Sequence, residues 1–166
     1  MRQAGAGTPG DATRAGSTDE SRRGADDRGG ATPPSGLSAG GSTRVLVVDD
    51  EPAVRRFVSD ALVRSGYDVI VAATGRDALA LVYADTVSPA LLITDIEMPG
   101  MSGVELAARV RADRPAIRVI LMTAREASAA RARERAGLVE AVLLKPFALA
   151  ELLAAVFETI GEPARD

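Results

Sequence analysis

Five short apolar runs alternate along the chain with stretches in which apolar residues recur every three or four positions. The runs occupy residues 44–48, 67–71, 90–94, 117–122 and 141–144. Apolar runs with little polar alternation are typical of parallel strands buried on both faces, and the three-to-four spacing is typical of helices with one face on a core. The order therefore predicts an α/β fold of five β–α units, in which a doubly wound parallel sheet carries helices on both faces.

The predicted helices differ in how well they can be anchored. The first begins at Pro52 and ends before Gly66, the second follows a Thr74 N-cap, and the third spans 104–111. The residues predicted to face the core are Val54, Phe57, Val58, Ala61 and Leu62 in the first helix, Ala78, Leu81 and Val82 in the second, and Leu149, Leu152, Leu153, Val156, Phe157 and Ile160 in the last. The stretch 125–136 consists almost wholly of Ala, Arg and Glu, so it lacks a large apolar anchor.

Composition divides the chain into a domain and two tails. Residues 1–43 hold two large apolar residues, Met1 and Leu37, and we expect this Gly-, Ser-, Arg- and Asp-rich segment to be disordered. The domain is predicted at 44–161, with 162–166 as a short tail and no output domain in these residues. No apolar run is long enough for a membrane-spanning helix, and the N-terminus lacks the apolar region of a secretory signal, so we expect a cytoplasmic protein.

The absence of histidine and cysteine narrows the chemistry. Without these residues the chain has no thiolate nucleophile, zinc finger or His-based acid–base catalyst. A net charge of −3 argues against nucleic acid as the main partner. Lys145 is the single lysine among 20 basic residues, and its compact ammonium differs chemically from the arginine fork.

Polar side chains follow the predicted strands where the strands end. Asp49 and Asp50 follow the first, Asp95 the third, Thr123 the fourth and Lys145 the fifth. Singly, an acid here could cap a helix or start a turn, and the threonine could be an ordinary strand-end hydroxyl. Parallel strands bring their carboxyl ends to one edge of the sheet, where ligands of such folds bind. Converging carboxylates suit Mg²⁺, while a hydroxyl and an ammonium suit a phosphoryl group, which together predicts phosphoryl-transfer chemistry.

Four motifs in this order resemble the receiver domain of bacterial two-component response regulators. They are VVDDEP from Val47, DIEMPGMSG from Asp95, MTA from Met122 and LKPF from Leu144, and the resemblance spans residues 44–148. It implies the flavodoxin-like receiver fold, in which a five-stranded parallel sheet has the strand order 2-1-3-4-5 and helices on both faces.

The resemblance also implies roles for individual residues. Asp95 is expected to accept a phosphoryl group from a sensor histidine kinase or a histidine phosphotransfer protein, with Thr123 and Lys145 contacting that group. The Mg²⁺ ligands are expected to be Asp49, through a water, together with Asp50, Asp95 and the backbone carbonyl of Glu97. The Lys145–Pro146 peptide bond is expected to be cis. The switch is then expected to act on an unknown downstream protein, without direct nucleic-acid contact or membrane insertion.

Some positions depart from the family pattern or vary within it. Val142 stands where the family usually has an aromatic residue or histidine, so the usual readout by ring rotation is in doubt and we expect helix 125–136 to shift instead. Glu97 and Arg125 are hypothesised to pair across the site and prolong the phosphorylated state. Arg131 and Arg135, one helical turn apart, face either a partner or solvent.

Two other functions remain open from the sequence. One is a phosphorylation-independent binding module with a vestigial site, which the valine at position 142 keeps under consideration. The other is an aspartyl-nucleophile phosphohydrolase, although its usual Asp-x-Asp spacing is absent because Asp49 and Asp50 are adjacent.

Overall fold

A computed structural model of the protein describes residues 43–84, 88–135 and 137–163. The elements are β1 (Arg44–Val48), α1 (Pro52–Arg64), β2 (Asp68–Ala72), α2 (Gly75–Tyr83), β3 (Leu91–Asp95), α3 (Gly103–Asp113), β4 (Arg118–Thr123), α4 (Glu126–Arg133), β5 (Ala141–Leu144) and α5 (Leu149–Ile160). The predicted disorder of the N-terminal tail falls almost entirely on residues outside the described ranges. No helix in the described ranges has the length and apolar character needed to cross a membrane.

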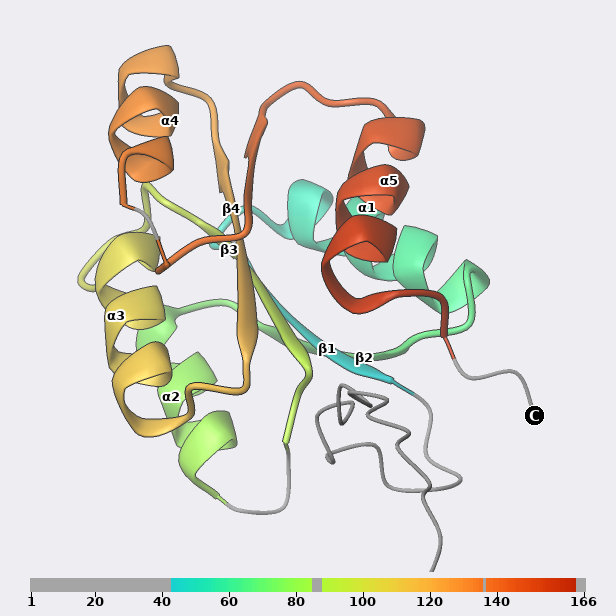
Figure 1. Ribbon diagram of the computed structural model, residues 1–166, viewed down its shortest axis with the longest axis horizontal. Coiled ribbons are helices and arrows are strands. Elements are labelled where there is room, and N and C mark those ends of the chain that lie inside the picture. Colours follow the sequence, from blue (N-terminus) through green and yellow to red (C-terminus); the bar gives the residue numbers. More distant parts are fainter. Residues whose placement is uncertain (1–42, 85–87, 136, 164–166) are drawn as a thin grey trace, which may run out of the picture. The chain divides into compact units, whose positions relative to one another are not determined.

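The five strands form one parallel sheet in the order β2-β1-β3-β4-β5, which confirms the predicted fold. Helices α1 and α5 cover one face, and α2, α3 and α4 cover the other (Figure 1). Strands β2, β3 and β4 each begin and end one residue later than predicted. For β3 and β4 the ladder explains the shift, because Asp95 still pairs with Met122 and Thr123 with Leu144, so both strands run through to the polar residue at the tip.

Each face of the sheet has its own apolar core. Under α1 and α5 the core includes Val58, Leu62, Leu152 and Val156, which are all fully buried. The opposite core lies under α2, α3 and α4. Burial of both faces explains why the strands read as apolar runs without alternation.

The apolar stripes of α1 and α5 are only partly buried, contrary to the prediction. Phe57 is 45% exposed, and Leu149 and Phe157 are also exposed. Phe57 and Phe157 lie at the margins of stripes that are wider than the strip of helix touching the sheet, whereas Leu149 is the first residue of α5. The centroid of the Phe57 ring lies 6.2 Å from that of the Phe147 ring, so the two aromatic side chains are tilted neighbours.

Helix α4 is weakly anchored, as its composition predicts. Its buried residues are two alanines, Ala129 and Ala132, so it places no large apolar side chain in the core. Helix α3 is fixed at its start by a capping box that was not predicted. The Ser102 side chain accepts a hydrogen bond from the Glu105 N–H, and the Glu105 carboxylate accepts one from the Ser102 N–H.

The first residue of α3 packs directly on the backbone of β3. A Cβ atom added to Gly103 would lie 2.0 Å from the carbonyl oxygen of Asp95 and 2.8 Å from its carbonyl carbon. The Gly103 N–H also donates to the Ile96 carbonyl at 3.0 Å. The loop after Asp95 therefore closes tightly only because residue 103 has no side chain.

Gly103→Ala is expected to lower the free energy of unfolding by about 2 kcal/mol or more, because backbone atoms must move to admit the methyl group. Denaturant unfolding followed by circular dichroism measures the loss. Gly100→Ala is the matched control in the same loop: its φ of +81° opposes a side chain, but no atom lies within 4 Å of the added Cβ. Its loss is expected to be smaller, about 1 kcal/mol. An equal or smaller loss for Gly103→Ala contradicts the close-contact explanation.

Candidate functional site

The carboxyl ends of β1, β3 and β5 open onto one pocket of about 460 Å³, which we call the acidic pocket. The residues lining it are Asp49, Asp50, Glu51, Asp95, Glu97, Ala124, Arg125 and Lys145. All four predicted Mg²⁺ ligands and the single lysine therefore lie in one place, and Thr123 borders it from β4.

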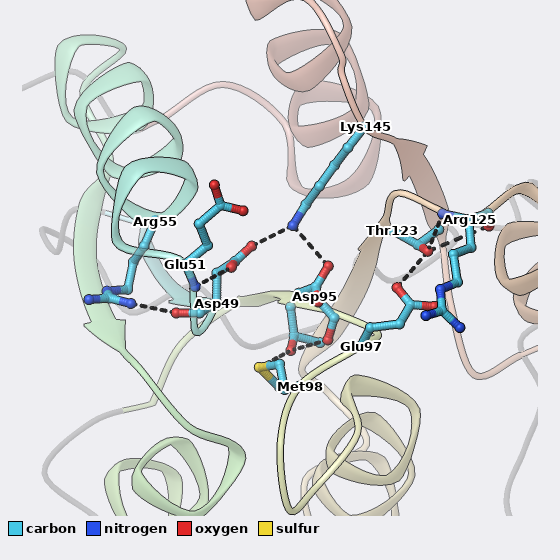
Figure 2. A network of polar contacts seen from close by, with 10 residues as sticks. Asp49, Glu51, Arg55, Asp95, Glu97, Met98, Thr123, Arg125 and Lys145 are labelled. Atoms are coloured by element: carbon cyan, nitrogen blue, oxygen red, sulfur yellow. Dashed lines mark hydrogen bonds and ion pairs between the residues drawn. The ribbon is translucent and has the colours of Figure 1, made fainter.

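Lys145 links the two buried acids of the pocket. Its ammonium donates to the Asp49 carboxylate at 2.8 Å and lies 2.9 Å from Oδ1 of Asp95. Figure 2 shows the lysine side chain reaching from the end of β5 between the two carboxylates. The Lys145–Pro146 bond is cis, as the resemblance implies.

The charges of the pocket are strongly influenced by burial. Burial raises the pKa of the Asp95 carboxyl, and Asp49 and Glu97 nearby raise it further, while the Lys145 ammonium opposes the increase. Burial also disfavours the charged form of Lys145, but its hydrogen bonds and ion pairs with both aspartates prevail and raise its pKa. The lysine thus stays protonated and supplies the positive charge that an ionised Asp95 needs.

The two aspartates after β1 lie in different environments. Asp49 is fully buried, and its second carboxylate oxygen accepts the Glu51 N–H at 2.8 Å. The Asp49 carbonyl accepts a hydrogen bond from Arg55 at 2.5 Å, which ties the start of α1 to the tip of β1. Asp50 is exposed at the rim. Arg55 was not predicted, because a helix-surface arginine gives no sequence signal of a backbone partner.

Thr123 is hydrogen-bonded through its hydroxyl to residues of two loops, Glu97 after β3 and Arg125 after β4. Its hydroxyl donates to the Glu97 carboxylate at 2.7 Å and accepts the Arg125 N–H at 3.0 Å (Figure 2). The predicted ion pair between Glu97 and Arg125 is not formed in this structure, since the described residues include no ion pair or hydrogen bond of the Arg125 guanidinium. The threonine hydroxyl competes successfully because it is fixed on the buried end of β4, whereas the exposed arginine must lose side-chain freedom to pair.

The donor atoms suit a hard cation, although the acids do not form a ready cage. Within the described ranges, no three acidic side chains converge closely enough to hold a metal ion by themselves. The predicted set needs only carboxylates of Asp50 and Asp95 and a backbone carbonyl of Glu97, with water filling the remaining positions, which is the arrangement Mg²⁺ favours. Oxygen-only donors at the mouth of the acidic pocket fit that ion.

The parallel sheet in the order 2-1-3-4-5 with helices on both faces is the fold of response-regulator receiver domains. The family model described as "Response regulator receiver domain" matches residues 45–157. The chain belongs to this family. Its members are generally signalling modules of two-component systems rather than enzymes.

Relatives with similar sequences include two mycobacterial regulators. The chain is 38% identical over 115 residues to the transcriptional regulatory protein TrcR of Mycobacterium tuberculosis, and the aligned region covers 69% of this chain and 44% of TrcR. It is 37% identical over 111 residues to the response regulator MprA of Mycolicibacterium vanbaalenii, and the aligned region covers 67% of this chain and 47% of MprA. The chain thus spans less than half the length of these relatives.

Solved structures of receiver domains align with this chain over nearly their whole length. The chain superposes on the response regulator TrrA of Thermotoga maritima, crystallised in complex with Mg²⁺-BeF, with a TM-score of 0.62, 32% identity and coverage of 71% of this chain and 99% of TrrA. The chemotaxis response regulator CheY4 of Vibrio cholerae gives a TM-score of 0.63, 31% identity and coverage of 71% and 98%.

Asp95→Asn is expected to raise the melting temperature by a few degrees at pH 7 without added Mg²⁺. The Asp95 carboxyl has a higher pKa in the folded state than in the unfolded state, where it is near 3.9. The folded protein therefore loses stability as the pH rises from the unfolded pKa through the folded one. The neutral amide escapes that loss. The gain should therefore shrink as the pH falls toward about 4, because the wild-type carboxyl takes up its proton over that range. Thermal unfolding of both proteins from pH 4 to pH 7 measures the effect.

The exposed Asp60 on α1 provides the matched control, and Asp60→Asn should change the melting temperature little. A gain from Asp95→Asn that is equal at both pH values, or a loss at pH 7, contradicts the burial argument.

Proposed function

We propose that this receiver domain, predicted at residues 44–161, accepts a phosphoryl group on Asp95 and thereby changes its contacts with a downstream protein. The observation that supports this most is the position of the Asp95 carboxylate: buried at the tip of β3, open to the acidic pocket and 2.9 Å from the Lys145 ammonium. A carboxylate so placed is shielded from bulk water yet reachable by a phosphodonor at the mouth.

In the proposed step, a carboxylate oxygen of Asp95 attacks phosphorus as the bond between phosphorus and the donor nitrogen of a phosphohistidine breaks. The electron pair leaves with the imidazole nitrogen, which takes up a proton. The reaction has little covalent work for the protein to do, so positioning and charge neutralisation dominate. Lys145 holds Asp95 before transfer and offers its ammonium to the phosphoryl oxygens afterwards.

Mg²⁺ bound by Asp50, Asp95 and the Glu97 carbonyl, with Asp49 acting through water, would neutralise charge on the phosphoryl oxygens. Asp49 additionally positions the lysine, because it accepts the Lys145 hydrogen bond at 2.8 Å. Thr123 must leave the Glu97 carboxylate before its hydroxyl can donate to the phosphoryl group. That exchange of partners is the first movement that phosphorylation requires.

The partners follow from the same chemistry. The donor is a sensor histidine kinase or a histidine phosphotransfer protein, and the receiver of the signal is another protein. Helix α4 is the element most suited to move, because it buries only alanines and its loop begins at Thr123. Val142 contributes to the apolar core beside α4 and has no ring to report the change.

Incubation with Mg²⁺ and acetyl phosphate, followed by intact mass spectrometry, is expected to show one added phosphoryl group per chain. Asp95→Asn and chelation of Mg²⁺ should each abolish the adduct, while Asp60→Asn should retain it. A chain that never forms the adduct is a phosphorylation-independent binding module. Sustained release of phosphate from phosphomonoesters without a stable adduct identifies a phosphohydrolase instead.

Glu97→Ala is expected to speed phosphorylation by acetyl phosphate roughly three- to tenfold. The substitution frees the Thr123 hydroxyl and removes a negative charge from the entrance of the acidic pocket. Glu97→Gln should lie between wild type and Glu97→Ala, because its amide oxygen can still accept the hydrogen bond. Adduct formation and loss are followed by mass spectrometry at fixed Mg²⁺ concentration.

Arg125→Ala separates this explanation from an ion pair across the site. The Arg125 backbone N–H keeps its bond to Thr123 in that variant, so we expect less than about a twofold change in either rate. If both alanine variants change adduct loss equally, Glu97 and Arg125 act as a pair and the competition for Thr123 is not the controlling contact.

A further inference from the structure

Helices α3 and α4 flank a second hollow, which we call the α3–α4 groove. It has a volume of about 350 Å³, and none of its lining residues lines the acidic pocket. Both helices cover the same face of the sheet (Figure 1). The groove is therefore a separate surface that phosphoryl chemistry does not explain.

One wall of the groove carries two unpaired positive charges. Arg131 on α4 and Arg135, two residues past the end of that helix, are exposed and line the groove. In the described part of the chain neither guanidinium has an ion pair or hydrogen bond. Arg133 between them differs, because it lies 3.7 Å from the Glu126 carboxylate.

The spacing of the two arginines suits a helical partner. The chain keeps turning past α4, because the Arg135 N–H donates to the Ala132 carbonyl at 3.1 Å. Side chains at i and i+4 of such a turn lie about 6 Å apart, which matches two carboxylates one turn apart on a bound helix.

The floor of the groove is apolar. Ile96, Val104, Ala108 and Ala132 line it, and Ile96 and Ala132 are also part of the buried core. Small side chains on both helices leave room for an aliphatic side chain of a partner. The apolar floor suits the apolar face of an amphipathic helix, and the cationic edge suits acidic side chains beside that face.

The opposite wall limits which anions can bind. The Glu105 carboxylate accepts hydrogen bonds from the Ser102 N–H at 3.0 Å and from the Ser102 hydroxyl at 2.9 Å. The backbone and side-chain hydrogen bonds from Ser102 lower the pKa of Glu105, so this wall stays negative at neutral pH. A nucleic-acid backbone, negative along its whole length, would meet this charge, and no aromatic residue lines the groove for base stacking. A protein segment can place its acids along the α4 edge alone.

We propose that the α3–α4 groove binds an acidic amphipathic helix of a partner protein, with its carboxylates on Arg131 and Arg135 and an aliphatic residue over Ile96 and Ala132. This docking goes beyond the phosphoryl switch and does not depend on it. The groove is nevertheless joined to the acidic pocket, because Ile96 follows Asp95 directly and donates its N–H to the Met122 carbonyl at 2.8 Å.

The test uses the full chain and a synthetic helical peptide of about 16 Ala, Leu and Glu residues, with two Glu one turn apart beside a Leu. Titration is followed by amide chemical shifts of the ¹⁵N-labelled protein. The expected result is a set of shift changes centred on Ile96, Val104 and Ala132, with affinity that falls as salt is raised. Arg131→Ala combined with Arg135→Ala should weaken binding about tenfold or more.

Two matched controls isolate the charge pairing. Arg133→Ala, on the same helix, should bind as wild type does, and a peptide with Gln in place of both Glu should bind about tenfold more weakly. Helicity of each variant is checked by circular dichroism. Asp95→Asn should bind the peptide as well as wild type does, so failure to form the acetyl phosphate adduct and failure of docking are independent results.

Several outcomes overturn the proposal. These are the absence of shift changes in the groove up to about 1 mM peptide, the weak end of specific affinity, and equal binding of the Glu and Gln peptides. Tighter binding of a single-stranded RNA oligonucleotide at the same residues would assign the groove to nucleic acid. Sedimentation showing that Arg131→Glu with Arg135→Glu converts a dimer into a monomer would assign it to a second copy of this chain.

Discussion

The ammonium of Lys145 balances two carboxylates that would otherwise be costly to bury. Asp49 is fully buried and Asp95 nearly so, and both lie within 3 Å of the lysine nitrogen. Since an unpaired buried charge is far more destabilising than a paired one, burial of the two acids depends on the lysine reaching the pocket. The lysine also ties the tip of the edge strand β5 to the tips of β1 and β3. The same ion pairs therefore hold the strand ends together and balance the charge of the pocket.

The helices on the two faces of the sheet are anchored by side chains of different size. On one face α1 and α5 both bury large aliphatic side chains, such as Leu62 and Leu152, in the core. On the other face α4 contributes only alanine methyl groups to the core, while its preceding loop is hydrogen-bonded to Thr123. A weakly anchored helix therefore lies next to Thr123, whose hydroxyl donates to the Glu97 carboxylate. The free energy of local opening is lowest where little apolar area is buried.

Much of the fold and of the candidate site could be predicted from the sequence, for a physical reason. Strands buried on both faces are apolar throughout, and parallel strands collect their end residues at one edge, so Asp49, Asp95 and Lys145 could be placed together from residue order alone. The orientation of exposed side chains could not. Glu97 has two available partners, and only the fixed position of the Thr123 hydroxyl decides between them. Likewise, the sequence shows how wide the apolar stripe containing Phe57 is, but not how much of that stripe the sheet covers. The contact of Gly103 with the Asp95 carbonyl depends on loop closure, which residue types alone do not encode.

The alanine-only anchoring of α4 also bears on how this domain can diverge. A helix whose inward residues are Ala129 and Ala132 imposes few steric requirements on its other positions, so substitutions on its outer surface change little in the free energy of folding. Duplicated copies of such a gene can therefore acquire new surface charges on α4 without passing through unstable intermediates. Related proteins that must stop recognising one another's partners can then diverge by a few mutations on α4, while the acidic pocket at the carboxyl edge of the sheet stays unchanged.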